Sequence, residues 1–202
     1  MKLKCEDTIY EADTDFRTAI ECNRIANDGT IGDFERALGV LITMFGDKVI
    51  ENPSHWEKLL KWVQNYLSCG KEVVEEDEEK DMDYIEDMDY IEASFMSDYG
   101  IDLKEVKMDW QKFYNLMNGL SNSELGNCCV LNRIRNLRNF DVSQVKDKKE
   151  RDKIIKAKKQ VELKCTSKEN NLTKEQEESM RKLNEIIFGK EWYYGRIRYN
   201  RN

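Results

Sequence analysis

The residues of this chain that could bind a soft metal ion or act as nucleophiles are its cysteines and its one histidine, His55. The cysteines are Cys5, Cys22, Cys69, Cys128, Cys129 and Cys165. A closed zinc site usually takes its four ligands as close pairs, and no two of these cysteines form a Cys-x-x-Cys pair. The sequence also has no Gly-rich phosphate loop, no His-Glu-x-x-His and no Gly-x-Ser-x-Gly. We therefore expect no catalytic residue, no metal and no cofactor, and hence no enzyme.

Cysteines scattered in this way are typical of free thiols in a reducing compartment, where they act as small buried hydrophobic side chains. His55 stands in the first turn of an expected helix, beside Trp56, without a sequence pattern that would supply a catalytic partner. Such a histidine is expected at the surface or at an interface.

Three charged segments could bind ions or nucleic acid. The acidic run Glu75–Glu79 lacks the alternating oxygen ligands and the glycine of a calcium loop, so a solvated linker is favoured. The lysine-rich stretch 146–159 could follow phosphates, but acids are interspersed and the whole chain has a net charge of −7. A solvated helix with i,i+4 ion pairs is the favoured interpretation. The segment 190–201 interleaves basic and aromatic residues, which suits single-stranded nucleic acid but also the anchoring of a tail.

Length and composition indicate a mainly α protein. The 202 residues fit one domain with appendages, 36% of them are charged, and one proline with ten glycines leaves few helix breakers. No apolar run approaches the roughly 20 residues of a membrane-spanning helix, and the N-terminus does not resemble a signal peptide. We therefore expect no membrane contact and a cytoplasmic location.

The first part of the chain, residues 1–70, is expected to hold a β-hairpin and three helices. Alternating side chains and turn residues predict the hairpin over residues 2–12. Each helix has a capping residue before it and a stop signal after it. The expected N-caps are Thr14, Asp33 and Asn52, the last followed by Pro53, and the expected ends are Asn27, Gly46 and Gly70.

An acidic linker is expected over residues 71–83, followed by a helix that ends at Gly100. From Lys71 to Glu92, twelve acids stand against two lysines, and the stretch contains the tandem hexapeptides 81–86 and 87–92, both Asp-Met-Asp-Tyr-Ile-Glu. Like charges with little apolar surface favour a flexible segment before the repeat. The second copy is expected to run into the helix, because apolar residues from Tyr84 to Tyr99 keep three-and-four spacing.

The rest of the chain divides into a helical part, 84–165, and a C-terminal part, 166–202. Further helices are predicted from Asp109 to Gly119, from Ser121 or Ser123 through Leu137, and over residues 143–163. The C-terminal part is expected to hold a helix capped by Thr173 and an aromatic and basic strand over 192–199.

Several segments together resemble the bacteriophage Gp-fifteen family. They are Asp15-Phe16-Arg17, Phe95 through Leu103, Trp110 through Phe113, Leu116 through Leu120, and Arg133 through Arg135. The resemblance runs in order over roughly residues 8–165. Asp109 stands where the family often has histidine, and the duplicated hexapeptide is a departure from the family pattern.

The resemblance implies a phage or prophage protein of the tail region, in the cytoplasm of an infected or lysogenic host. The gene position of the family resembles that of tail assembly chaperones. The resemblance therefore implies that the partner is the tape-measure protein or another tail protein, with self-association as a further option. The expected partner-binding residues are Trp56, Tyr99, Trp110, Phe113 and Tyr114. The alternative for each aromatic residue is packing in the chain's own core. The alternative functions are a structural head–tail component and a regulatory nucleic-acid-binding protein, although nucleic acid is disfavoured by the net charge.

Overall fold

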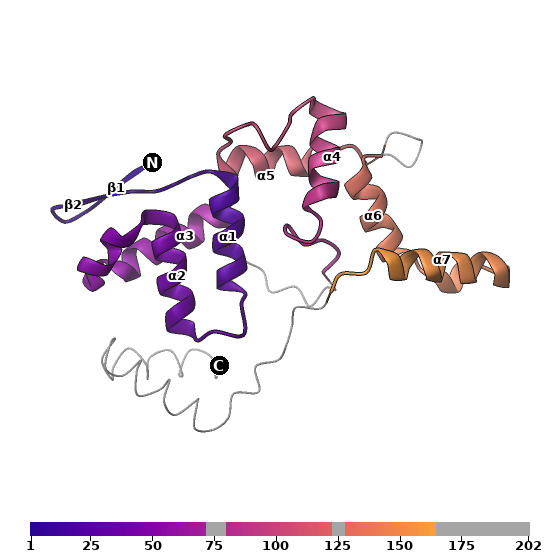
Figure 1. Cartoon of the computed structure of the whole chain (residues 1–202), viewed down its shortest axis with the longest axis horizontal. Helices are drawn as coiled ribbons and strands as arrows, with labels where there is room; N and C mark the ends of the chain where they lie inside the picture. Colours follow the sequence, from indigo (N-terminus) through magenta and orange to yellow (C-terminus); the bar gives the residue numbers. More distant parts are fainter. Residues whose placement is uncertain (72–79, 123–127, 165–202) are drawn as a thin grey trace, which may run out of the picture.

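The computed structural model describes residues 1–71, 80–122 and 128–164 and shows a mainly α protein with a small N-terminal hairpin, as predicted (Figure 1). Strands β1 (Lys2–Cys5) and β2 (Thr8–Glu11) pair antiparallel, with Leu3 opposite Tyr10. The short turn between them places Glu6 at φ 50°. Cys5 and Tyr10 are buried, so one face of the hairpin packs against the helices.

Three helices follow the hairpin: α1 (Phe16–Ala26), α2 (Asp33–Phe45) and α3 (Trp56–Leu67). All three were expected, but their starts differ: α1 begins one residue and α3 three residues after the predicted start, whereas α2 begins one residue before it. The carboxylate of Asp15, rather than Thr14, accepts the hydrogen bond from the Arg17 backbone N–H and caps α1. Gly32 is the N-cap of α2, and Asp33 is its first residue.

The region between α2 and α3 consists of two 3-10 turns. They are η1 (Asp47–Glu51) and η2 (Pro53–His55), so Asn52 precedes a 3-10 turn and not the α-helix itself. Pro53 still lies at the first position of its turn, where a missing N–H costs nothing. This arrangement moves the start of α3 to Trp56.

Helix α4 (Met88–Tyr99) begins within the second hexapeptide, as expected, and α5 (Trp110–Asn118) follows it. Gly100 ends α4 at φ 66°, a left-handed conformation that glycine adopts without steric cost. Asp109 caps α5 by accepting the Gln111 backbone N–H at 2.9 Å. Both ends of α5 lie where the sequence placed them, since Gly119 is its C-cap.

Helix α6 (Val130–Asn139) begins well after the predicted start at Ser121 or Ser123. Tertiary contacts hold the segment before it, since Asp98 accepts the Ser121 backbone N–H at 2.8 Å. The Ser121 carbonyl then accepts the backbone N–H of Cys129, which is the N-cap of α6. A 3-10 turn, η3 (Val142–Gln144), and a last described helix, α7 (Lys148–Gln160), complete the order. The charged helix is therefore shorter than the predicted 143–163, because Asp147 caps it.

The core contains a cluster of aromatic rings centred on Phe113. Its ring stacks on Phe16 at 4.5 Å and on Phe95 at 5.2 Å between centroids, and Trp110 and Tyr84 complete the cluster. These rings come from α1, α4, α5 and the first hexapeptide, so one side chain joins segments nearly 100 residues apart. The predicted acidic run within 72–79, the helix after Thr173 and the strand over 192–199 lie outside the described residues.

Candidate functional site

The segments that carry the family resemblance pack against one another in space. Phe16 stacks on Phe113, and the guanidinium of the adjacent Arg17 donates hydrogen bonds to the backbone carbonyls of Leu103 and Val106. The Tyr99 hydroxyl donates to the Leu116 carbonyl at 2.9 Å. The fingerprint is thus, in large part, a packing signature that joins α1, α4 and α5.

The N-termini of α1 and α5 are joined through their backbones. The Trp110 N–H donates to the Thr14 carbonyl at 2.9 Å, and the Phe16 N–H donates to the Met108 carbonyl at the same distance. The Tyr66 hydroxyl donates to the Asp109 carboxylate at 2.9 Å. Burial and this carboxylate raise the pKa of Tyr66, so the phenol remains a donor. Asp109 therefore both caps α5 and fixes it to α3.

The aromatic residues that were expected to bind a partner are mostly enclosed in this core. Trp56, Trp110 and Phe113 are 6%, 1% and 0% exposed, so an approaching protein can touch no more than a ring edge. Tyr99 and Tyr114 are half-buried, and the Lys71 ammonium lies 4.8 Å from the centroid of the Tyr114 ring. In the folded chain the first three are core residues, and the assignment of the five residues to partner binding stays a prediction.

The fingerprint residues also border an open recess of about 610 Å³ where the C-termini of α4 and α5 meet the N-terminus of α6. Its lining includes Asp98, Tyr99, Gly119, Ser121, Cys128 and Arg133. Gly119 allows the close approach of the Tyr99 hydroxyl, since an added Cβ would come within 2.9 Å of this oxygen. Asp98 is already engaged by the Ser121 N–H, which lowers the pKa of its carboxyl. These lining contacts serve the local fold.

His55 is buried rather than at the surface, which corrects the sequence-based expectation. Its Nδ1 lies 2.9 Å from the Tyr10 hydroxyl, so it ties the hairpin to the start of α3. Cys5, Cys22 and Cys129 are buried free thiols, while Cys69 and Cys128 are half-buried and also free. Over the described ranges, no group of three histidine, cysteine or acidic side chains could hold a metal ion.

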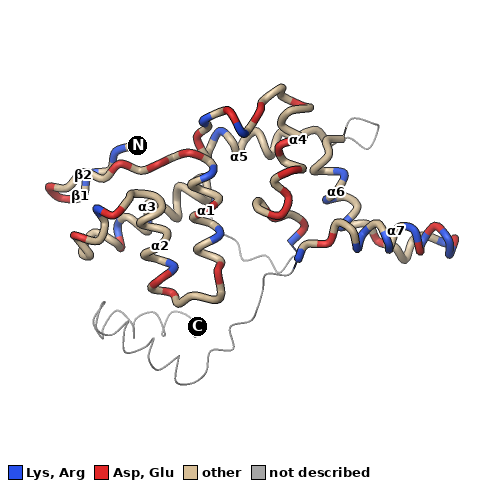
Figure 2. The backbone as a smooth tube through the Cα atoms, in the orientation of Figure 1, with Lys and Arg blue, Asp and Glu red and all other residues tan. Residues whose placement is uncertain are grey.

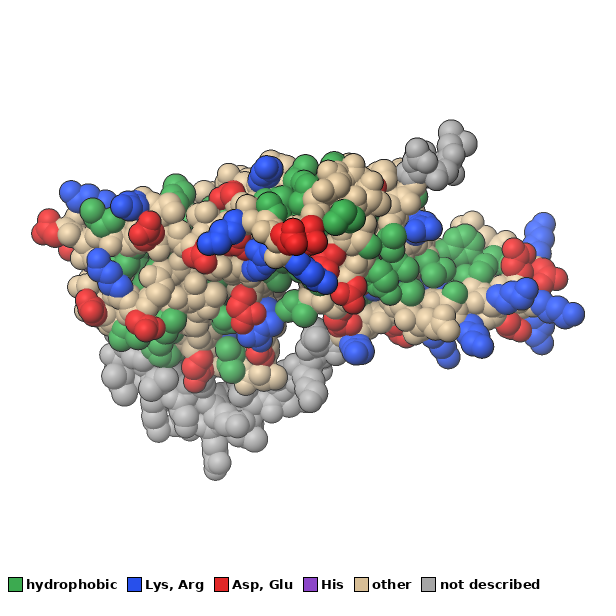
Figure 3. Space-filling view, turned by 45° about the horizontal axis from the view of Figure 1, so that its top comes forward, with side chains coloured by type: hydrophobic (Ala, Val, Ile, Leu, Met, Phe, Trp, Pro, Cys, Tyr) green, Lys and Arg blue, Asp and Glu red, His purple; other side chains and the backbone are tan. Residues whose placement is uncertain are grey.

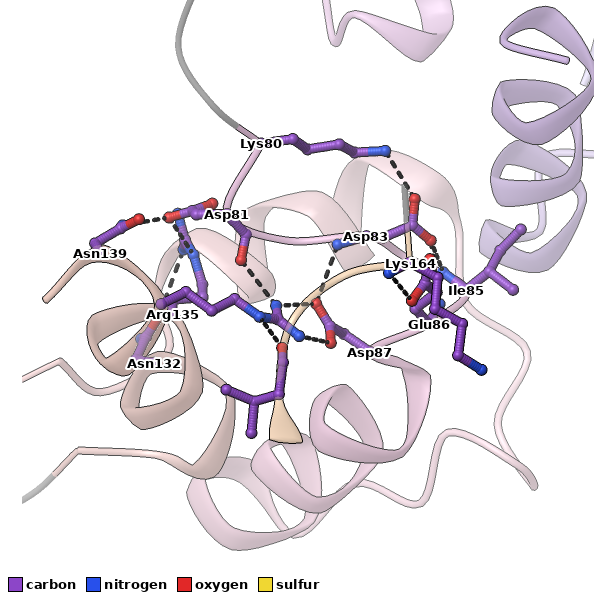
Figure 4. Close-up of polar contacts among 12 residues, drawn as sticks. Lys80, Asp81, Asp83, Ile85, Glu86, Asp87, Asn132, Arg135, Asn139 and Lys164 are labelled. Atoms are coloured by element: carbon purple, nitrogen blue, oxygen red, sulfur yellow. Dashed lines mark hydrogen bonds and ion pairs between the residues drawn. The ribbon is translucent and has the colours of Figure 1, made fainter. Parts of the chain in front are cut away.

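A buried ion pair ties α6 to the duplicated hexapeptide (Figure 4). The Arg138 guanidinium donates to both carboxylate oxygens of Asp87 at 2.7 Å, and Asp87 is 1% exposed. Arg138 also donates to the backbone carbonyls of Asp81 and Val161. The hydrogen bond to Asp87 raises the pKa of Arg138, which keeps the guanidinium protonated. One arginine therefore joins the repeat, α6 and the end of α7.

The first hexapeptide makes the outer part of the same network. Arg135 lies one helical turn before Arg138 and pairs with Asp81 at 3.0 Å, at partial exposure. Asp83 accepts the backbone N–H groups of Ile85 and Glu86 and pairs with Lys80. Although burial raises the pKa of the Asp83 carboxyl, the Lys80 and backbone hydrogen bonds outweigh it and lower the pKa. Residues 81–83, expected in the linker, are thus fixed to α6.

Beyond this anchor, the chain forms what we call the arm, residues 139–164, which contains η3 and α7. Helix α7 projects from the body at one end of the long axis, and none of its residues is buried (Figure 1). Phe140 and Ile155 are 42% and 39% exposed. Figure 3 shows hydrophobic side chains gathered where this helix leaves the body. Sequence reasoning did not single out either residue.

The arm is also strongly basic. Between Lys148 and Gln160, seven basic residues stand against two acids, and Figure 2 shows the basic positions along the whole helix. The i,i+4 ion pairs expected there are not formed with any part of the chain that the structure describes. Arg151 instead donates to the Val145 carbonyl, and Lys158 donates to the Phe140 carbonyl. The arm therefore presents exposed apolar side chains within a field of positive charge.

The fold and this arm define a mainly α protein whose signature residues build a core and whose exposed apolar side chains lie on both the body and the arm. Residues 2–163 match the family described as Bacteriophage Gp15 protein. The chain therefore belongs to this phage family, as its fingerprint indicated. No curated protein and no solved structure matches the chain. Throughout the described residues, no helix has the length and apolar character needed to cross a membrane.

Proposed function

We propose that this phage protein acts in tail assembly as a non-catalytic chaperone of the tape-measure protein. The observation that carries the proposal is the pair Phe140 and Ile155, exposed on an arm outside the core of a phage-family chain. A tape-measure protein is long and helical, so its apolar seams need cover until tail tube subunits polymerise around it. Exposed apolar side chains on a projecting helix can provide such cover.

The energetics favour reversible binding. Fully burying a Phe or Ile side chain contributes roughly 1.5–3 kcal/mol, and both side chains are already more than half covered in the free chain. Two such contacts give weak affinity by themselves, so stable coverage requires several copies along one partner. This suits a chaperone, which must leave when the tube assembles.

Co-expression with the tape-measure protein of the same genome tests the proposal. We expect a soluble complex that depends on this chain, and we expect Phe140→Ser to reduce the recovered complex severalfold. Ile50, which is 51% exposed in η1, offers the matched control, since Ile50→Ser removes a similar exposed side chain from the opposite part of the molecule. A tape-measure protein that stays insoluble and free of this chain would contradict the proposal.

The same preparation separates the chaperone from a structural head–tail component. A chaperone leaves the tail before completion, so purified phage particles should lack this chain. A structural component would be present in stoichiometric amount, and its detection by mass spectrometry of particles would favour that alternative.

A regulatory nucleic-acid-binding role is the second candidate, favoured by the basic residues of α7, which form no ion pair within the described part of the chain. It predicts binding to DNA or RNA that falls steeply with salt concentration, because phosphate contacts release counterions. The net charge of −7 opposes long-range attraction to nucleic acid. A gel-shift titration at two salt concentrations distinguishes this role from the chaperone.

A further inference from the structure

We propose that the arm docks an amphipathic helix whose apolar stripe is flanked by acidic residues, seated on the face formed by Phe140 and Ile155. The inference rests on the proposed function, and it names the surface and the chemistry by which the tape-measure protein would be held. The occupant is a segment of that partner, recognised by shape and charge together.

Phe140 and Ile155, which we call the patch, lie on neighbouring parts of the arm although 15 positions separate them. The Lys158 ammonium donates to the Phe140 carbonyl at 2.8 Å, and Lys158 stands three residues after Ile155 on the same side of α7. Neither apolar residue belongs to the buried core or to the partly buried side chains packed against it. Within the described residues, both side chains are therefore exposed on the arm and outside the core.

The rim of this patch is basic. Lys148 and Lys159 stand seven residues before and four residues after Ile155, so they lie on the same helical face. Both are exposed, and neither forms an ion pair within the described part of the chain. Asp152 is the one acid on this face of α7.

Charge complementarity decides between possible occupants. A second copy of the same arm would bring two helices with net charges of +5 together, which costs energy where charges are desolvated. A helix with Asp or Glu beside its apolar residues would instead pair with the rim lysines. The positive charge of the arm thus favours binding of an acidic partner helix over association with a second copy of this chain.

The arm is held in place before any partner arrives. Arg138 joins the Val161 carbonyl to Asp87, and Arg151 donates twice to the Val145 carbonyl. The first bond fixes the C-terminal end of α7 to α6, and the Arg151 bonds fix α7 to the segment that precedes it. A preorganised face loses less conformational entropy on binding, which is why the anchor matters for affinity. At 1.5 Å per residue, α7 offers about 20 Å of docking length, or three to four turns of a partner helix.

The test compares two double variants of the full chain, both co-expressed with the tape-measure protein. Lys148→Glu with Lys159→Glu reverses the rim charges, while Lys149→Glu with Lys153→Glu makes the same charge change on the other side of α7. We expect the rim variant to lose about tenfold in affinity, equivalent to about 1.4 kcal/mol, and the control to stay within about threefold. Circular dichroism should show the same helix content and melting temperature for both variants.

A photocrosslinker at position 155 identifies the occupant, with a crosslinker at position 50 as the control. Crosslinks from position 155 to an acid-flanked apolar segment of the tape-measure protein support the inference. A complex that forms with equal affinity in both charge variants, or that crosslinks from position 155 to this chain itself or to a second copy, overturns the inference while the chaperone function stands. Absence of any complex overturns the chaperone function as well.

Discussion

Asp81 and Asp87 occupy the same position in two identical hexapeptides, yet their surroundings differ. Asp87 is 1% exposed and receives two hydrogen bonds from Arg138, whereas the side chains of Asp81 and Arg135 are 25% and 40% exposed. Water screens the outer pair, so it contributes little to stability. The inner pair is desolvated, and each of its charges depends on the other.

The two aspartates give a matched pair of mutations. Asp87→Ala should lower the free energy of unfolding by about 3–5 kcal/mol, because the Arg138 charge remains buried without its partner. Asp81→Ala should cost about 1 kcal/mol or less. Urea denaturation followed by circular dichroism measures both. Equal losses for the two variants would contradict the assignment of the buried pair.

We expect the carboxyl of Asp98, at the edge of the recess, to make the free energy of unfolding depend on pH. The Ser121 backbone N–H lowers the pKa of the Asp98 carboxyl in the folded chain, although burial acts in the other direction. A folded-state pKa below the unfolded value contributes stability above the unfolded pKa, near 3.9, and this contribution is lost as pH falls through the folded-state pKa.

Asp98→Asn should therefore be less stable than the wild type at neutral pH, by about 1 kcal/mol, and the difference should shrink on acidification. Unfolding free energies measured between pH values of about 6 and about 2 check this. Glu105→Gln is the control, because Glu105 is exposed and forms no side-chain hydrogen bond within the described ranges. A constant difference across the range would exclude the charge of Asp98 as the cause.

At the scale of elements, the same six residues adopt two structures. The first copy forms the turn before α4, while the second copy enters α4. The physical reason is the position of each copy relative to the core, since the Arg138 bond fixes Asp87 at the N-terminus of α4. Local propensity is identical in both copies, so tertiary contacts decide the outcome.

The isoleucines of the two copies make this testable. Ile91 is 0% exposed and Ile85 is 49% exposed. Ile91→Ala should cost about 2–5 kcal/mol through lost burial and a cavity, whereas Ile85→Ala should stay within about 0.5 kcal/mol. Denaturation midpoints of the two variants, compared at constant m-value, measure the contrast. A large loss for Ile85→Ala would mean that the first copy is also packed in the core.

At the scale of the whole molecule, our proposal assigns stability to the core and partner binding to the arm. Trp110 stacks on the central Phe113 and donates from Nε1 to the Leu67 carbonyl at 3.0 Å. Trp110→Ala should therefore destabilise the isolated chain by about 3–5 kcal/mol and abolish cooperative melting. Phe140→Ser should leave the melting temperature nearly unchanged while it weakens partner binding.

Thermal melts of the two variants without the partner test this division. If Trp110→Ala melts like the wild type and loses the tape-measure protein, the residue would belong to the binding face after all. If Phe140→Ser unfolds, the arm would be part of the core.

The sequence by itself determined the mainly α class, the hairpin, most helices and the family. These features depend on local signals such as side-chain periodicity, the Asp109 cap and the Gly100 stop, which act within a few residues. Only the tertiary structure decided that Trp56, Trp110 and Phe113 are core residues, that α6 starts at Val130, and that an apolar patch lies open on the arm. Each of these depends on contacts between residues far apart in the chain, such as Asp87 with Arg138 and Asp98 with Ser121, and no local pattern specifies them.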